Sequence, residues 1–138
     1  MATLNLNEAL YVLLAGTAAL TALTGTRIYK GVAPDSADMP RLTYFSFTEE
    51  PKHAMSGDLG TNEECIQVDV WAETYSSMVA VSNQVKAALR DYNDTVTSGA
   101  DSLVIKWIYF DDSRDFFDDD PKKRVKLFRK CLEFTVWY

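Results

Sequence analysis

Apolar and polar residues alternate through residues 65–71, near the middle of the chain. Ile66, Val68 and Val70 fall on one side of this alternation, while Gln67 and Asp69 fall on the other. A period of two in β-branched residues is typical of a strand with one buried face. The pattern therefore predicts a half-buried strand at the centre of the fold.

The period changes directly after this strand. Apolar residues then recur at helical spacing, so that one stripe of a helix is formed by Met78, Val81, Val85, Leu89 and Tyr92. Such a stripe predicts an amphipathic helix that packs on a core. A strand is thus expected to lead into a helix without a long connection.

A second helix is predicted at residues 6–15. Asn5 stands three residues before Glu8, which is the spacing of a capping box, and Gly16 follows as a helix stop. A short helical turn over residues 18–23 is expected next, ending at Gly25.

Three further strands are predicted at residues 41–48, 103–110 and 125–138, where aromatic and aliphatic residues recur. Residues 51–60 and 111–121 hold proline, glycine and charged residues and predict two long loops between strands. The order is helix–strand–strand, repeated once. It predicts an α+β fold: an antiparallel or mixed sheet of about four main strands with two helices packed on one face.

The composition indicates one globular domain, residues 1–138, in which 47% of the residues are hydrophobic and 25% are charged. The net charge of -6 argues against a free-standing nucleic-acid binder and against attraction to an anionic membrane. The apolar stretch at residues 9–22 is too short to span a bilayer. Cys65 and Cys131 are expected to be free thiols.

The residues offer little catalytic chemistry. His53 is the single histidine and cannot build a zinc site alone. An acidic run at residues 111–120 holds the carboxylates of Asp111, Asp112, Asp115, Asp118, Asp119 and Asp120. Carboxylates can bind Ca²⁺ or Mg²⁺, but the glycine and the distal glutamate of an EF-hand are missing. We expect that the protein is not an enzyme and binds no cofactor. The alternative is a small metal-binding or enzymatic domain that uses this acidic run.

Aromatic residues are frequent in the predicted strands, among them Trp71, Trp107 and Trp137. Most are expected in the core. In a domain of this size two helices leave some of that apolar surface uncovered, which favours self-association.

Several short motifs, taken in order, resemble the phage tail completion or tail terminator family. They are residues 25–29 (GTRIY), 32–34 (VAP), Pro40 before a tyrosine-bearing strand, 67–72 (QVDVWA) with Thr74 and Tyr75, Arg114 with Asp115, and 132–138 (LEFTVWY). Together they cover almost the whole chain.

The resemblance implies a virion protein of the tail, at the joint with the head, that is assembled in the host cytoplasm. Such proteins form a ring, usually of six copies, on the head-proximal end of the tail tube. The implied partners are other copies of this chain, the tail tube protein and the head completion or connector protein, while DNA passes through without specific binding. The family brings no catalytic residues. Besides the six aspartates above, we expect Met55, Leu59, Phe116 and Phe117, in the two predicted loops, to contact partners or the bore.

Overall fold

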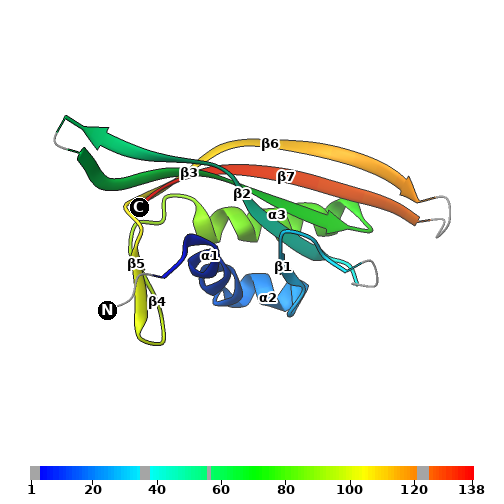
Figure 1. The fold of residues 1–138 in the computed structure, drawn as a ribbon. Coiled ribbons are helices and arrows are strands. Elements are labelled where there is room, and N and C mark those ends of the chain that lie inside the picture. The colour runs from blue at the N-terminus through cyan, green and yellow to red at the C-terminus, as the bar shows by residue number, and fades with distance from the viewer. Residues whose placement is uncertain (1–3, 35–37, 56, 121–124) are drawn as a thin grey trace.

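The computed structural model describes residues 4–34, 38–55, 57–120 and 125–138. These residues form two layers: a sheet, and helices that all lie on one face of it (Figure 1). The elements in chain order are α1 (Leu6–Ala15), α2 (Ala18–Thr24), β1 (Ile28–Lys30), β2 (Arg41–Ala54), β3 (Gly57–Ala72), α3 (Tyr75–Leu89), β4 (Thr95–Ser98), β5 (Asp101–Val104), β6 (Trp107–Asp120) and β7 (Val125–Trp137). The predicted α+β class is confirmed.

Local sequence signals set the helix boundaries. The Asn5 side chain accepts a hydrogen bond of 2.9 Å from the backbone N–H of Asn7, and α1 then runs to the predicted end before Gly16. Thr74 caps α3 in the same way, through the N–H of Ser77 at 3.2 Å. The expected turn after α1 is a third helix, α2, so the prediction of two helices was one too few.

The main sheet has five strands in the order β1-β2-β3-β7-β6. β1 runs parallel to β2, while β2–β3, β3–β7 and β7–β6 are antiparallel, so the sheet is mixed. The four long strands correspond to the four that the sequence predicts, and β1 is a short addition at one edge. β3 lies at the centre, as the alternation of residues 66–70 suggested.

The core lies between the sheet and the helices. Ile66, Val68 and Val70 of β3 are fully buried there, which confirms the predicted inward face. The helices contribute Leu10 and Leu14 from α1, and the predicted α3 stripe is buried up to Leu89. No single helix among the described residues is long and apolar enough to cross a bilayer. Only α1 and α2 taken together have the length and apolar composition of a membrane span, and they are bent by 84° relative to one another.

The prediction of one strand at residues 103–110 was wrong in its boundaries. Leu103 ends a separate small hairpin, β4–β5, which turns at Gly99 with a φ of 62°. β6 begins only at Trp107, after a break at Ile105 and Lys106. Residues 103–110 are apolar apart from Lys106, because both segments bury residues against the same core, so a single charged residue is all that marks the break in the sequence.

The two predicted long loops were wrong: residues 51–60 and 111–120 are mostly strand. β2 and β3 pair out to Ala54 and Gly57, and β6 and β7 pair out to Asp120 and Val125. We call residues 49–54 with 57–63 the β2–β3 arm, and residues 115–120 with 125–130 the β6–β7 arm. Figure 1 shows these arms reaching beyond the helices in opposite directions.

Charge pairing explains why such polar segments form strands. The register places Asp115 opposite Lys130 and Asp119 opposite Lys126 across the β6–β7 arm. Opposite charges at facing positions stabilise an antiparallel pair, and the backbone of each strand is satisfied by the other. Most described side chains of the arms lie away from the core, with Phe128 at the base of the β6–β7 arm as the exception, so the strands show no regular alternation of apolar residues.

Candidate functional site

The described carboxylates of the acidic run, Asp111, Asp112 and Asp115, do not form a single cluster, because β6 is a strand whose side chains alternate between the two faces of the sheet. Asp112 pairs in register with Glu133 on the face without helices, while Asp115 pairs with Lys130 on the helix face. A bulge between Phe110 and Asp112 shifts this alternation by one residue.

Each described carboxylate of the run already has a protein partner. Asp111 accepts a hydrogen bond from the Thr135 hydroxyl. Asp112 Oδ2 lies 3.6 Å from Arg114 Nε. Asp115 accepts from Lys130 Nζ at 3.0 Å and from the Tyr75 hydroxyl at 3.4 Å. The side chains of Asp118, Asp119 and Asp120 lie outside the described residues.

This arrangement does not favour the metal-binding or enzymatic alternative. The three described carboxylates of the run face in two directions and are engaged by cations and hydroxyls. Within the described residues, no group of three or more histidine, cysteine, aspartate or glutamate side chains is placed to hold a metal ion. His53 belongs to β2, and its side chain lies outside the described residues.

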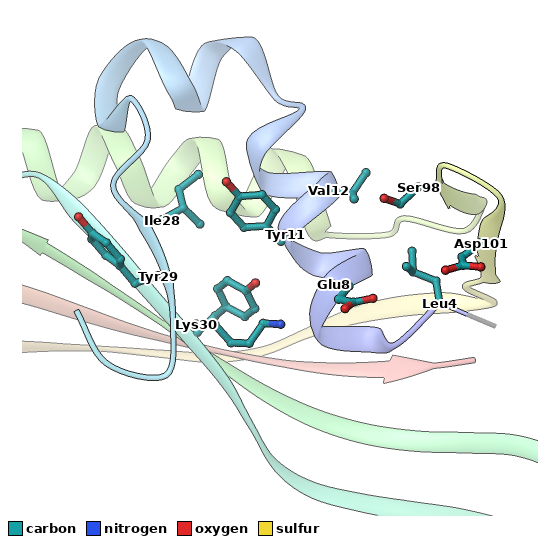
Figure 2. A pocket seen from close by; sticks show the side chains of 10 residues that line it. Leu4, Glu8, Tyr11, Val12, Ile28, Tyr29, Lys30, Ser98 and Asp101 are labelled. Atoms are coloured by element: carbon teal, nitrogen blue, oxygen red, sulfur yellow. The ribbon is translucent and has the colours of Figure 1, made fainter. Parts of the chain in front are cut away.

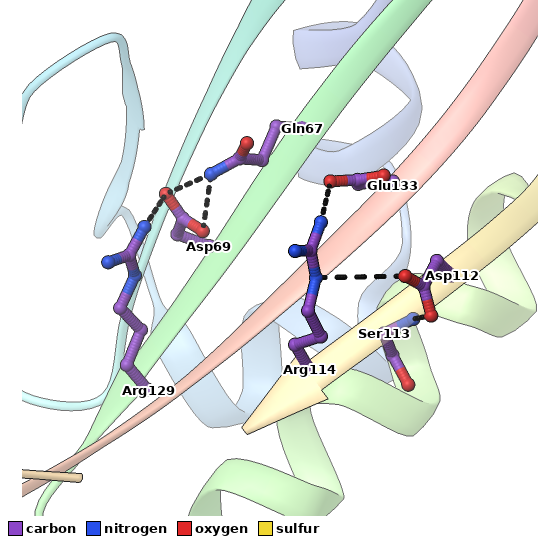
Figure 3. Close-up of polar contacts among 7 residues, drawn as sticks. All are labelled: Gln67, Asp69, Asp112, Ser113, Arg114, Arg129 and Glu133. Carbon is purple, nitrogen blue, oxygen red and sulfur yellow. Dashed lines mark hydrogen bonds and ion pairs between the residues drawn. The ribbon is translucent and has the colours of Figure 1, made fainter. Parts of the chain in front are cut away.

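The sheet face without helices carries a covered ion pair that the sequence analysis missed. Arg129 Nη2 donates to Asp69 Oδ2 at 3.1 Å, and Gln67 donates to the same carboxylate at 3.1 Å (Figure 3). The guanidinium lies 5.0 Å from the ring centre of Trp71 and 5.2 Å from that of Phe116. These neighbours leave Asp69 only 4% exposed, on a face that no helix covers.

Cys131 lies opposite Asp69 in the register and shares this dry environment. Burial, followed by the charge of Asp69 and a hydrogen bond with it, raises the pKa of Cys131 to about 11. Cys131 and Cys65 are both free, as predicted, because neighbouring strands place other residues opposite them. The thiol of Cys131 is therefore a packing group.

A second ion pair on this face is more exposed. Arg114 Nη2 lies 2.6 Å from Glu133 Oε1, and both lie beside the outer edge of the sheet (Figure 3). The edge itself, β6, presents exposed Trp107 and Tyr109, whose ring centres are 6.3 Å apart. An unpaired edge strand with exposed aromatic residues can take another chain beside it.

The predicted aromatic contacts of the β6–β7 arm lie on opposite faces. Phe116 is held under Arg129, while Phe117 lies on the helix side, 71% exposed, with its ring 5.4 Å from that of Phe128. Tyr75, at the start of α3, packs on the other edge of Phe128 at 6.2 Å. The base of the arm is therefore anchored to the helix layer, and Phe117 remains available for a partner.

The β2–β3 arm is equally accessible. Met55 lies in its turn and is fully exposed. Leu59 belongs to β3, but its side chain lies outside the described residues. Phe47, at a bulge where β2 leaves the helix layer, is 50% exposed and was not singled out from the sequence.

A hollow of about 510 Å³ lies between α1, β1 and the β4–β5 hairpin. Figure 2 shows Glu8 and Tyr11 of α1 and Lys30 of β1 directed towards it. Tyr44 forms its inner wall and donates a hydrogen bond of 3.1 Å to the carbonyl of Asn7. Burial, with Tyr11 and Glu8 nearby, raises the pKa of Tyr44 to about 12, so the hydroxyl remains a neutral donor.

The comparisons with known proteins identify relatives of the whole fold. The model of a family described as tail completion protein gp17 matches residues 8–138. A chain in the solved structure of the virion of a native gene transfer agent particle is 21% identical, with a TM-score of 0.65, over 95% of this chain and 92% of that one. That likeness shows a shared fold. No curated protein matches the chain.

Proposed function

Because this chain belongs to the tail completion protein gp17 family, we propose that it closes the phage tail as a ring at the end that joins the head. It is a structural protein of the virion tail, and its family match over residues 8–138 is the single observation that carries the proposal. In the proposed role the ring, of about six copies, stops growth of the tail tube and offers the head connector a surface.

The shape of the subunit supports ring formation. Its two arms reach in opposite directions from one sheet (Figure 1), so each copy has different surfaces at its two ends. Contacts between unlike surfaces repeat head to tail and close into a ring when the rotation between copies allows it. Exposed Met55 at one arm and exposed Phe117 at the other provide apolar contacts for neighbouring copies or for the tube and connector.

The described carboxylates of β6 project from both faces of the sheet, and those on a given face have two possible places in such a ring. If they line the bore, their charge repels the phosphates of DNA and prevents it from sticking. If they face the joint, they pair with a basic patch on the tube or connector protein. Changing Asp111, Asp112 and Asp115 to asparagine should slow DNA ejection in the first case. It should weaken docking in the second, most clearly at low salt.

Removal of the protein from the assembling phage tests the proposed function. Tails made without it should grow to abnormal lengths or fail to join heads in negative-stain micrographs, and expression of the protein in trans should restore both properties. Tails of normal length that join heads in its absence would exclude the proposal.

A further inference from the structure

Two exposed aromatic side chains mark the start of β6, on the face of the sheet without helices. Trp107 is 37% exposed and Tyr109 is 50% exposed, and their ring planes are tilted by 38°. Tryptophan and tyrosine contribute much of the binding energy at the centres of protein interfaces, because they offer a large and rigid surface. We call these two residues the Trp107 patch.

The orientation of Trp107 is fixed by Asp91, the residue that follows the C-cap of α3. The indole N–H of Trp107 donates a hydrogen bond of 3.1 Å to Asp91 Oδ1. The backbone N–H of Asp91 donates to the carbonyl of Ile108 at 2.9 Å, and the N–H of Ile108 donates to the carbonyl of Tyr92 at 3.0 Å. The chain after α3 therefore lies along the start of β6, closes the strand edge at Ile108 and holds Trp107 in place.

Asp91 has the backbone conformation that glycine prefers. Its φ is 60°, and among the described residues it alone has a positive φ without being a glycine. Glycine is the usual residue at this position after a helix, since it has no Cβ to clash. The contact of the Asp91 carboxylate with Arg90, at 4.0 Å, joins two exposed side chains and adds little stability. The strain therefore has one evident use, which is to keep the acceptor that orients Trp107.

The opposite end of the sheet carries a projecting aromatic ring. Phe117 is 71% exposed, more than any other aromatic side chain among the described residues. Its ring stands at 84° to that of Phe128, which in turn stands at 77° to the ring of Tyr75 in α3. Two edge-to-face contacts thus connect Phe117 to the helix layer and fix its direction. Exposed apolar groups held in this way mark surfaces that meet other proteins.

We propose that Phe117 of one copy packs against Trp107 and Tyr109 of the next copy. This inference rests on the proposed ring and assigns the two unlike surfaces of each contact within it. Trp107 pairs in register with Trp137 near the C-terminus, and Figure 1 shows that end of the sheet opposite the β6–β7 arm. A head-to-tail contact brings opposite ends of two copies together. The residues that dominate binding on one partner commonly meet those of the other, and aromatic rings pack well edge to face.

Complementation between two single variants tests this pairing. Trp107→Ala removes the patch but keeps Phe117, whereas Phe117→Ala does the reverse. Each variant alone should assemble about tenfold more weakly than the wild type, or worse, in native mass spectrometry across a concentration series, because every contact lacks one surface. An equimolar mixture should form 1:1 dimers and no closed rings. Only the contact between Phe117 of the first variant and Trp107 of the second is intact.

The matched control is the chain that carries both substitutions. Mixed with either single variant it should give no dimers, since no intact pair of surfaces can form. The melting temperature of each variant should stay within about 3 °C of the wild type, because both side chains lie at the surface.

Substitutions of Asp91 test the orientation of Trp107 while both aromatic surfaces stay in the chain. Asp91→Gly relieves the backbone strain but removes the acceptor, so the subunit should be at least as stable as the wild type while its assembly weakens severalfold. Asp91→Asn keeps an acceptor oxygen and tolerates the same φ, so its assembly should match that of the wild type. Equal assembly of the glycine variant and the wild type would reject the role of Asp91.

The outcomes separate this inference from the proposed function. A wild-type chain that stays monomeric at every concentration, and on tails, would reject the ring itself. Single variants that close rings as readily as the wild type would reject only the aromatic contact. A mixture of the two variants that stays monomeric while the wild type forms rings would also reject it, since the two surfaces would then have other partners.

Discussion

At the scale of single residues, Val70 tests the assignment of the inward sheet face. It is fully buried at the centre of β3. Val70→Asp would bury a charge without a partner and should lower the free energy of unfolding by about 3 kcal/mol or more. Val32→Asp, the same change at a side chain that is 86% exposed, should alter it by less than about 0.5 kcal/mol in urea denaturation. Equal stability of the two variants would show that the face is misassigned.

Substitution of Arg129 and of Arg114 allows the covered Arg129–Asp69 ion pair to be compared with the exposed Arg114–Glu133 pair. Arg129→Met leaves the buried Asp69 carboxylate without its cation and should lower the free energy of unfolding by about 2 kcal/mol. This loss is smaller than that for a fully buried pair, because the Arg129 side chain is 31% exposed. Arg114→Met removes a pair whose arginine side chain is 57% exposed and should lower it by less than about 1 kcal/mol. Similar losses in urea denaturation would mean that the aromatic cover over Arg129 does not strengthen its pair.

At the scale of elements, the arms should be less protected from hydrogen exchange than the centre of the sheet. A two-stranded ribbon is marginally stable alone, and Figure 1 shows the β6–β7 arm extending past the helices. In the free subunit, amides of residues 115–120 should exchange much faster than those of residues 66–70. Assembly should slow exchange in the arms. Equal protection of arm and centre in the free subunit would contradict this account.

The sequence is most informative for elements with one buried face. Residues 66–70 and the stripe from Met78 to Leu89 could be assigned correctly because burial imposes the period of a strand or helix. The arms could not be assigned, since apart from Phe128 at the base of the β6–β7 arm their described side chains do not pack against the core. The acidic run followed by a basic run was the available signal, because it becomes a ladder of opposite charges once the chain folds back.

The candidate sites depended on the register of distant strands, which no local pattern specifies. Asp69 and Arg129 meet only because β3 and β7 are neighbours. Asp91 and Trp107 likewise meet only because the chain after α3 lies along the start of β6. The aromatic residues of β6 were visible in the sequence, but the faces they occupy were not, because a bulge between Phe110 and Asp112 shifts the alternation of the strand.

At the scale of the whole molecule, the fold is one main sheet with a helix layer on one face, a small β4–β5 hairpin and an arm at either end of the main sheet (Figure 1). This shape suits an assembly unit better than a catalyst, because its long edges and arms offer surface to other chains. The net charge of -6 agrees with the proposed ring, because a negatively charged bore would not hold DNA.

The central claim is that the protein occupies one end of the tail, and gold labelling tests it most directly. Purified protein with an affinity tag is added to tails assembled without it, and tag-specific gold is then counted by electron microscopy. The account predicts gold at one end of each tail, the end that afterwards joins heads. Gold spread along the tube, or tails left bare that nevertheless join heads, would contradict it.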